Sequence, residues 1–495
     1  MADAPRYRFG PLERRGVLAG LRGSQLAIVF GVGLVALAAL RSLPPGTGLL
    51  AAIAVVMLGA VTAFVPVVGR TCDEWLPVIG SWAARTASGR RSFTSTAPLA
   101  GATIELDTPP DFPAALRDVV ILSHELTGSP ASIGIIKDRR GGTYTGILSV
   151  GGKAFALLDA PDKARRLSSW AGILAGLARE GGLIQRVQWV ERTVPDPGDE
   201  IGAYLKENVA VPLDSRLARS YLEVVDEAGP VTQEHEVLVA LQISAARAAR
   251  AIKAAGGGDF GACEVLRREL TALSSSLLAA EITVDGALTP RLVAQVLRTS
   301  FDPSCRARLA SIGSRDPSRA GTSLPNAGPM DAEEAWNTFR SDGAWHATYW
   351  VAEWPRIDVD PDFLAPLLLR TECMRTVAVT MEPVSPLRAM RSVESARTSA
   401  AADEELRHRA GFVTTMRRER EHEALAAHER DLSDGHAFYR FAGFITVTAQ
   451  TRDELVSACG QIEEAAGRSF LDIRRLNGEQ GLAFTYTLPL CRGLK

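Results

Sequence analysis

The chain has 495 residues, of which 46% are hydrophobic and 23% are charged, a balance typical of folded proteins and not of disordered ones. Its formal net charge is −2, so no overall positive field favours phosphates, and we expect no direct nucleic-acid binding. Six cysteines are scattered along the chain without the close pairs that structural zinc sites use. We therefore expect reduced thiols and no metal, in a chain with room for two or three domains.

Two apolar segments near the N-terminus have the length of membrane spans. Residues 26–40 form an unbroken apolar run, and residues 48–68 contain no charged side chain. About 20 apolar residues cross a hydrocarbon core of ~30 Å. The Pro-Pro-Gly link between the segments is too short for a domain, so the two helices must be antiparallel. The sequence predicts a transmembrane helical hairpin over residues 23–68, preceded by a basic segment at residues 1–22.

Arginine residues around the hairpin predict its orientation. Five of them precede the first span, four follow the second span before residue 92, and the connecting turn carries only Arg41. The positive-inside rule then places both flanks in the cytoplasm. A cleaved signal peptide fits less well, because the charged lead is too long and a second span follows at once. We expect a two-span protein of the inner (cytoplasmic) membrane with both termini cytoplasmic.

Residues 69–101 are predicted to form a juxtamembrane linker. This segment contains Trp75 and Trp82 among Arg, Ser and Ala residues. Tryptophan rings suit the headgroup layer of a membrane, but packing against the protein body would explain them equally well. The sequence leaves both interpretations open.

A first cytoplasmic α+β region is predicted over residues 102–302. Short extended runs are separated by Gly141-Gly142 and Gly151-Gly152, which are hairpin-turn signals. Apolar residues then recur at helical spacing before a further strand, so a β-hairpin is followed by a helix and a strand. This order is half of a split-βαβ, or ferredoxin-like, sandwich. The predicted strands are residues 133–138, 143–150, 154–158, 187–194 and 237–243, and the predicted helices are residues 167–178, 262–281 and 289–299.

A linker is predicted at residues 303–330, where Pro, Ser, Arg and Gly dominate without periodicity. A second cytoplasmic α+β region at residues 331–495 repeats the pattern of the first. Its predicted elements are a strand at 344–353, a helix at 362–369, a strand at 374–382, a long helix at 387–432, a strand at 438–448, a helix at 451–467, an extended segment at 470–476 and a closing segment at 483–488. The fold class is therefore α+β: a transmembrane helical hairpin followed by ferredoxin-like modules with helical insertions.

Two stretches resemble catalytic motifs only superficially. Residues 146–153 depart from the spacing of a phosphate-binding loop, and Ala154 stands where that loop has a hydroxyl residue. The tripeptide Ser123-His124-Glu125 contains catalytic residue types, but adjacent residues rarely face one reacting atom. We assign neither stretch a catalytic role.

A third candidate is the histidine pair His422 and His428. Zinc proteases place two histidines one helical turn apart, whereas these are six residues apart and fall on different faces of a helix. Charges of alternating sign around them indicate a solvated helix face. We therefore expect no catalytic, cofactor-binding or metal-binding residue, and no enzymatic activity.

Several short segments resemble a known family. Residues 7–16 (YRFGPLERRG), the two spans, residues 144–148 (YTGIL) and residues 187–196 are similar to the actinobacterial conjugation-associated membrane family. Its members look like a fusion of two parts of type IV secretion systems. One part is a small two-span inner-membrane subunit, and the other is the N-terminal, non-ATPase domain of the large secretion ATPase.

The likeness to the ATPase N-terminal domain is confined to the C-terminal part of the chain. Residues 417–435, residues 438–449 and the closing residues 480–490 (QGLAFTYTLPL) match its pattern of charged helix, strand, helix and terminal motif. In the ATPases a nucleotide-binding domain follows that motif, whereas here the sequence ends at Lys495. The resemblance therefore implies no ATPase activity and no cofactor.

Three hypotheses remain open at this point. The first is a non-catalytic docking subunit of a conjugative type IV-like secretion system, which recruits a separately encoded ATPase and other inner-membrane subunits to the lipid bilayer. The alternative is a type VII secretion membrane subunit of EccE type, which also has two N-terminal spans and a cytoplasmic domain. The third is a membrane-tethered enzyme without a recognisable motif. Self-association is left open by all three.

Overall fold

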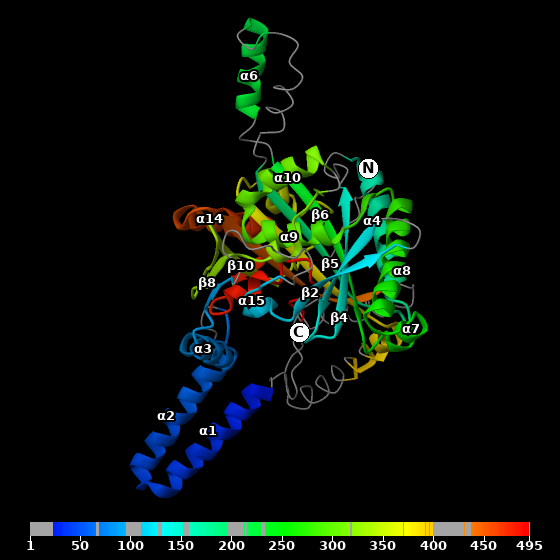
Figure 1. Ribbon diagram of the computed structural model, residues 1–495. Coiled ribbons are helices and arrows are strands. Elements are labelled where there is room, and N and C mark those ends of the chain that lie inside the picture. Colours follow the sequence, from blue (N-terminus) through cyan, green and yellow to red (C-terminus); the bar gives the residue numbers. More distant parts are fainter. Residues whose placement is uncertain are drawn as a thin grey trace. The chain divides into compact units, whose positions relative to one another are not determined.

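The structure, a computed structural model, falls into two units (Figure 1). The hairpin unit contains residues 10–91 and 395–425, and the sheet unit contains the remainder, mainly residues 92–394 and 426–495. The structure describes residues 23–65, 69–95, 110–126, 131–151, 158–195, 212, 215–228, 233–316, 319–369, 371–391, 393–395, 397–398, 430 and 437–494.

The hairpin unit begins with two antiparallel helices, α1 (Gly23–Ser42) and α2 (Pro45–Phe64). Pro44 precedes α2 and Pro45 occupies its first turn, where a missing N–H has no consequence. Both helices are long and apolar enough to cross a membrane. The predicted hairpin is thus confirmed as a pair of candidate spans in a membrane protein.

Small residues let α1 and α2 pack closely. The buried residues of α2 are Gly48, Ala52, Gly59 and Ala63. A Cβ atom at Gly59 would lie 2.4 Å from Cγ2 of Val32, so only glycine fits there. Small residues at such spacing are a common way for helices to associate in lipid.

The open end of the hairpin is fixed by two hydrogen bonds. Gln25 of α1 donates from Nε2 to the carbonyl oxygen of Ala63 at 3.0 Å, and Ser24 donates from Oγ to Asp73 at 2.6 Å. Asp73 belongs to a third helix, α3 (Cys72–Ala87). The first turn of α3 therefore lies beside the first turn of α1, at the end of the hairpin opposite its turn.

The sheet unit contains two halves with the same order of elements. The first half comprises β2 (Val119–Glu125), β3 (Ser132–Asp138), β4 (Thr143–Gly151), α4 (Ala160–Leu177), β5 (Ile184–Pro195), α6 (Arg216–Ala228), β6 (Gln233–Ser244), α7 (Ala249–Ala254), α8 (Gly258–Ala279), β7 (Thr283–Ala287) and α9 (Pro290–Phe301). The second comprises β8 (Asp331–Glu334), β9 (Phe339–Ser341), β10 (Ala344–Glu353), α11 (Ala365–Leu369), β11 (Met374–Val384), β12 (Phe438–Ala449), α14 (Arg452–Arg468), β13 (Asp472–Arg475) and α15 (Gln480–Phe484).

Each half is an elaborated ferredoxin-like unit. In the first half, β6 lies between β4 and β5, runs antiparallel to both, and β7 pairs with the other edge of β4. In the second half, β12 lies between β10 and β11 in the same way, and β13 pairs with the other edge of β10. Two interleaved βαβ units with this strand order define the split-βαβ sandwich, which confirms the predicted fold class.

The two halves join in one antiparallel sheet through β5 and β11. The strand order is β1-β8-β9-β10-β12-β11-β5-β6-β4-β3-β2, with β1 (Ser92–Thr94) at one end beside β8. The strands of the two predicted regions thus form a continuous surface. The central strands are buried on both faces, as a sheet covered on both sides requires.

The register of the strands relates the two halves by an approximate two-fold rotation. After the last strand of each half, a leucine N–H donates to the first strand of its ferredoxin-like core: Leu288 to Ile147 at 2.9 Å, and Leu476 to Thr348 at 3.0 Å. The next residues of these strands form equivalent rows of residues paired across three strands: Leu148–Val239–Trp189 in the first half and Tyr349–Ile445–Val377 in the second. One residue further along, Val190 corresponds to Ala378, and these two residues are direct partners.

Each face of the sheet has its own apolar core. On one face, α8 and α14 pack over the first and second halves respectively, and Trp189 of β5 contacts both clusters. On the opposite face a single cluster spans both halves and includes side chains of α9, α15 and the C-terminal segment. Figure 1 shows α8 and α14 over different ends of the sheet.

The predicted linker at residues 303–330 contains regular structure. It includes η4 (Pro303–Cys305), α10 (Arg306–Arg315) and η6 (Leu324–Ala327), all short 3-10 or α-helical segments, and a further 3-10 turn, η1 (Ala114–Leu116), precedes β2. Cys305 and Leu309 are buried and hold α10 against the body of the sheet unit. The linker's role as a domain boundary remains a prediction.

Two predicted elements fall mainly on residues that the structure does not describe. These are the strand at residues 154–158 and the long helix at residues 387–432. The closing segment at residues 483–488 begins in helix α15 and continues as turns.

Candidate functional site

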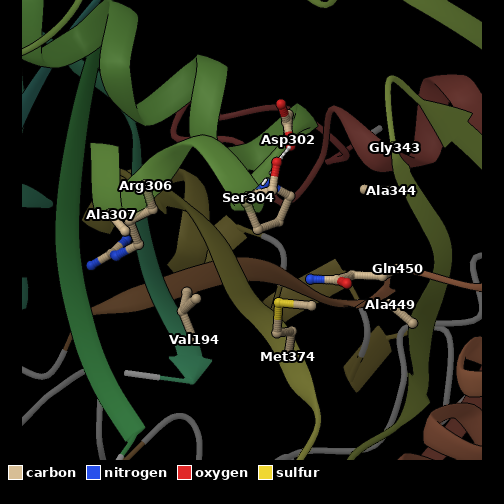
Figure 2. Close-up of a pocket in the computed structure, with 11 residues that line it drawn as sticks. Val194, Asp302, Ser304, Arg306, Ala307, Gly343, Ala344, Met374, Ala449 and Gln450 are labelled. Carbon is tan, nitrogen blue, oxygen red and sulfur yellow. Dashed lines mark hydrogen bonds between the residues drawn. The ribbon is translucent and has the colours of Figure 1, made fainter. Parts of the chain in front are cut away.

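The candidate site is a cavity of about 340 Å³ at the ends of the central strands, where β5 of the first half lies beside β11 of the second. The strands form one wall of the cavity. This wall contains Val194 at the end of β5, Met374 at the start of β11 and Gln450, which follows β12. Figure 2 shows these side chains facing the segment that carries Asp302 and Ser304. The remaining lining residues are Pro303, Arg306, Ala307, Gly343, Ala344 and Ala449.

Arg306, at the start of α10, connects one wall of the cavity to β6. Its guanidinium forms ion pairs with Glu234 at 2.8 Å and with Glu236 at 3.3 Å. Arg192 of β5 pairs with the same Glu236 carboxylate at 2.8 Å and donates to Oγ1 of Thr299 at 2.9 Å. The two arginines and two glutamates therefore balance in charge.

The charges of this cluster stabilise one another despite burial. Burial disfavours the ionised form of Glu236, but Arg192 and Arg306 outweigh that effect and hold its pKa below the ordinary value. Burial likewise lowers the pKa of Arg192, and Glu236 opposes the change. Removing one member would leave a buried charge without its partner. These groups are engaged in holding α10 to the sheet.

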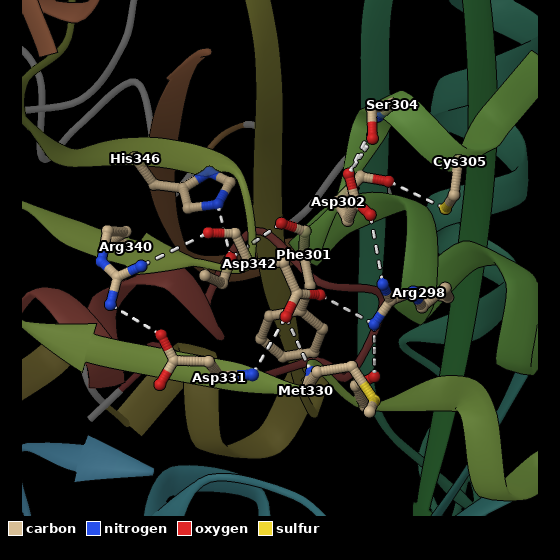
Figure 3. Close-up of polar contacts among 12 residues, drawn as sticks. Arg298, Phe301, Asp302, Ser304, Cys305, Met330, Asp331, Arg340, Asp342 and His346 are labelled. Atoms are coloured by element: carbon tan, nitrogen blue, oxygen red, sulfur yellow. Dashed lines mark hydrogen bonds and ion pairs between the residues drawn. The ribbon is translucent and has the colours of Figure 1, made fainter. Parts of the chain in front are cut away.

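A second polar cluster surrounds Arg298 of α9 (Figure 3). The guanidinium forms ion pairs with Asp302 at 3.1 Å and with Asp342 at 2.8 Å, and it donates to the carbonyl oxygen of Gly328 at 2.8 Å. Asp342 has a positive φ of 48° in the β9–β10 turn, and its other carboxylate oxygen accepts from the N–H groups of Met330 and Asp331. Arg298 thereby joins the end of the first half to the β9–β10 hairpin of the second.

His346 lies behind this cluster and is completely buried. Its ring nitrogens contact Oγ of Ser341 at 2.8 Å and Oγ1 of Thr448 at 3.0 Å, and the ring packs against Phe339 and Phe484. Burial lowers the pKa of His346 to about 3, so the imidazole is neutral at physiological pH. Its hydroxyl partners suit a structural role.

The chemistry of the two clusters is that of fixed ion pairs. On the cavity wall the Ser304 hydroxyl donates to Asp302, and that carboxylate is itself held by an ion pair with Arg298. Burial raises the pKa of Cys305, the nearest thiol, so it is not an activated nucleophile. Across the part of the chain that the structure describes, no group of three or more His, Cys, Asp or Glu side chains could hold a metal ion.

The described residues of the stretches that resemble catalytic motifs do not line this cavity. Gly146 lies inside β4, where a Cβ atom would approach Cδ1 of Leu270 to 2.5 Å, so glycine is required for packing and not for phosphate binding. On β2, the His124 side chain is buried, and its Nε2 lies 3.4 Å from Oε2 of Glu264. Ser123 and Glu125 lie on the opposite, exposed side of the strand. His422 and His428 lie outside the described residues.

The closing motif at residues 480–490 has an architectural role. Gln480 accepts from the N–H of Thr348 at 2.8 Å and donates to its carbonyl oxygen at 3.2 Å. Gln188 of β5 donates to the carbonyl oxygen of Tyr486 and accepts from the N–H of Cys491, at 2.8 and 2.7 Å. Two buried amide side chains, Gln480 of α15 and Gln188 of β5, thus hold the C-terminal segment across the face that both halves share.

Sequence reasoning did not identify Arg192, Arg298, Arg306 or Asp342. Arg306 was assigned to a linker, and its partners on β6 precede it by about 70 residues. The one local signal was Asp342-Gly343, a dipeptide typical of two-residue hairpin turns.

One family matches part of the chain. Residues 231–351 match the model of EccE, a family described as a type VII ESX secretion system translocon component. The matched range covers about a quarter of the chain, from β6 to β10, and includes Arg298, Arg306 and Asp342. No curated protein matches the sequence. The chain is therefore similar to EccE over its centre, and the type VII alternative has the support of a family match.

Proposed function

We propose that this protein is a non-catalytic membrane subunit of a type VII secretion translocon. Helices α1 and α2 anchor it in the bilayer, and the sheet unit offers surfaces for other subunits of the secretion complex. The observation that carries the proposal is the EccE match over residues 231–351. The match favours this reading over a conjugative type IV-like subunit.

The location of the matched residues supports a structural role. They begin at β6 and end in β10, so they contain the segment that connects the first half to the second, together with Arg298 and Arg306. The ion pairs of these two arginines hold α9, α10, β6 and the β9–β10 turn to one another. Ion pairs that join elements of the fold fit a scaffold.

The proposed orientation places the sheet unit in the cytoplasm. At the closed end of the hairpin the only arginine is Arg41, in the last turn of α1, whereas Arg70, Arg85, Arg90 and Arg91 follow α2. This distribution obeys the positive-inside rule when both termini are cytoplasmic. Labelling of a cysteine introduced at Gly46, in a variant whose six native cysteines are replaced by serine, tests it in intact cells: a membrane-impermeant maleimide should react there and not at a cysteine introduced at Ala272.

Copurification tests the proposed function. The full chain, tagged at its C-terminus and extracted in mild detergent from native membranes, should copurify with other membrane subunits of a type VII translocon. A variant with Arg298→Met, which disturbs the connection between α9 and the β9–β10 turn, should recover less of the complex than one with Arg468→Met on the exposed end of α14. Recovery of a conjugation ATPase instead would support the type IV reading, and retained nucleotide would support an enzyme.

A further inference from the structure

We propose that α3 is an interfacial helix that lies in the headgroup layer and binds anionic phospholipid. The inference rests on the proposal that α1 and α2 span the membrane. It concerns a third helix, too polar to span, which would give the protein a lipid-binding surface beside its anchor.

The position of α3 is fixed at the membrane boundary. The helix starts eight residues after the end of α2 at Phe64, and the Ser24–Asp73 hydrogen bond of 2.6 Å holds its first turn to the first turn of α1. A capping box at Thr71 and Glu74 defines that first turn. If the hairpin crosses the bilayer, α3 begins where the hydrocarbon core meets the headgroups.

One face of α3 is apolar, with Leu76 and Ile79 exposed and the two tryptophans half-buried. Trp75, Ile79 and Trp82 recur at intervals of four and three residues, and Leu76 and Ala83 flank them on the same side. Leu76 is 68% exposed and Ile79 is 50% exposed. Large apolar side chains exposed together on one helix face, next to a membrane anchor, are suited to insertion among acyl chains.

Arginines border this apolar face. The guanidinium of Arg70 lies 5.4 Å from the ring centre of Trp75, and that of Arg91 lies 4.5 Å from the ring centre of Trp82. Tryptophan rings prefer the headgroup level, and arginines at the same level attract phosphates and anionic lipids. The ring–guanidinium pairs therefore place apolar surface and positive charge side by side.

The local charge balance favours an anionic surface. Arg85 and Arg90 add to the two stacked arginines, against Asp73 and Glu74. Both carboxylates serve the helix start: Asp73 accepts from Ser24, and Glu74 accepts from the N–H of Thr71. The helix thus has its acidic residues in the first turn and its arginines around the apolar face and the C-terminal end. Anionic phospholipid is the occupant that matches both features.

Tryptophan quenching by brominated lipid tests the proposal in the full chain. Of eight tryptophans, Trp75 and Trp82 are in α3, none is in α1 or α2, and the others are in the sheet unit. The protein is reconstituted into vesicles of dibrominated phosphatidylcholine, with or without about one-third phosphatidylglycerol. We expect quenching of up to about a quarter of the emission, larger with phosphatidylglycerol. Trp75→Phe/Trp82→Phe should abolish it, and Trp336→Phe should not.

A pair of matched charge substitutions distinguishes the apolar face from the helix as a whole. Ile79→Glu places a carboxylate on the apolar face, whereas Ala84→Glu places the same group on the opposite, exposed side of the same helix. Ile79→Glu should reduce the quenching at least two-fold and should weaken its dependence on phosphatidylglycerol. Ala84→Glu should leave both within error of the wild type.

The outcomes separate this inference from the proposed function. Equal quenching in wild type and Trp75→Phe/Trp82→Phe, or equal effects of Ile79→Glu and Ala84→Glu, would overturn it even when the protein floats with the vesicles. Failure to float after alkaline extraction would refute the anchor itself. Loss of translocon copurification in Ile79→Glu, without lipid quenching in the wild type, would assign this face to a protein partner and contradict the proposal.

Discussion

Val190 of β5 lies directly opposite Ala378 of β11, and each residue is the counterpart of the other in the repeated halves of the sheet. The approximate two-fold axis of the sheet unit therefore passes between them. Both residues are completely buried, in the core that extends across both halves. The junction is a strand pairing with a packed apolar face, and the two halves are stabilised as one body.

The first prediction concerns this junction. Ala378→Leu adds volume where the side chain is fully buried, so it should lower the free energy of unfolding by about 1–3 kcal/mol. Ala272→Leu, on the exposed side of α8, makes the same chemical change and should alter it by less than about 0.5 kcal/mol. Urea unfolding followed by tryptophan fluorescence measures both. Equal effects would show that the junction is not tightly packed.

The second prediction concerns the hairpin. Gly59→Leu should separate α1 from α2, because even a Cβ atom there would lie 2.4 Å from Val32. Gly33→Leu on α1 should be tolerated, since a Cβ atom at that position has no neighbour within 4 Å. The temperature at which the detergent-solubilised protein aggregates, followed by size-exclusion chromatography, should fall for Gly59→Leu alone. A similar fall in both variants would argue against the close packing of α1 and α2.

The third prediction is an acid-dependent loss of stability caused by His346. Burial lowers its pKa to about 3 in the folded protein, against an ordinary value of about 6.5 in the unfolded chain. Between these values the unfolded state binds the additional proton, so stability falls as the pH drops, by up to about 1.4 kcal/mol per pH unit. Above about pH 6.5 this contribution to stability is constant.

Substitution of His346 isolates that effect. His346→Gln retains hydrogen-bonding capacity but cannot be protonated, so its unfolding free energy should vary less between about pH 7 and pH 5 than that of the wild type. Urea titrations at the two pH values measure the difference. An identical pH dependence in the two proteins would show that another group controls acid stability.

The fourth prediction concerns Arg298. Arg298→Met removes the partner of two largely buried carboxylates, Asp302 and Asp342, and should cost about 3–5 kcal/mol of stability. Asp342→Asn keeps an oxygen that can accept from Met330 and Asp331, and asparagine tolerates the positive φ at this turn. Asp342→Asn should therefore be less harmful in the Arg298→Met background than in the wild type. Additive effects in this double-mutant cycle would deny the coupling.

Local pattern predicted much of the fold. The predicted strand at residues 344–353 coincides with β10, because a run rich in aromatic residues favours a strand within a single segment. Thr289 and Pro290 predicted the start of α9, where Thr289 caps the helix and Pro290 occupies its first turn. The hairpin followed from length and apolar composition alone.

The remainder depends on contacts between distant segments. The pairing of β5 with β11 joins residues separated by more than 180 positions, and nothing within either strand specifies its neighbour. Likewise, Arg306 belongs to a stretch whose composition resembles a linker, and its structural role becomes evident only beside Glu234 and Glu236. The candidate cavity could not be predicted for the same reason, since its walls come from both halves.

Deletion of the gene in the native host, with complementation by the full chain, tests the proposed role in type VII secretion most directly. Export of a type VII substrate and conjugative transfer are measured side by side. We expect export into the medium to be lost on deletion and restored on complementation, with conjugative transfer unchanged. Normal export in the deletion strain, accompanied by loss of conjugative transfer, would contradict it.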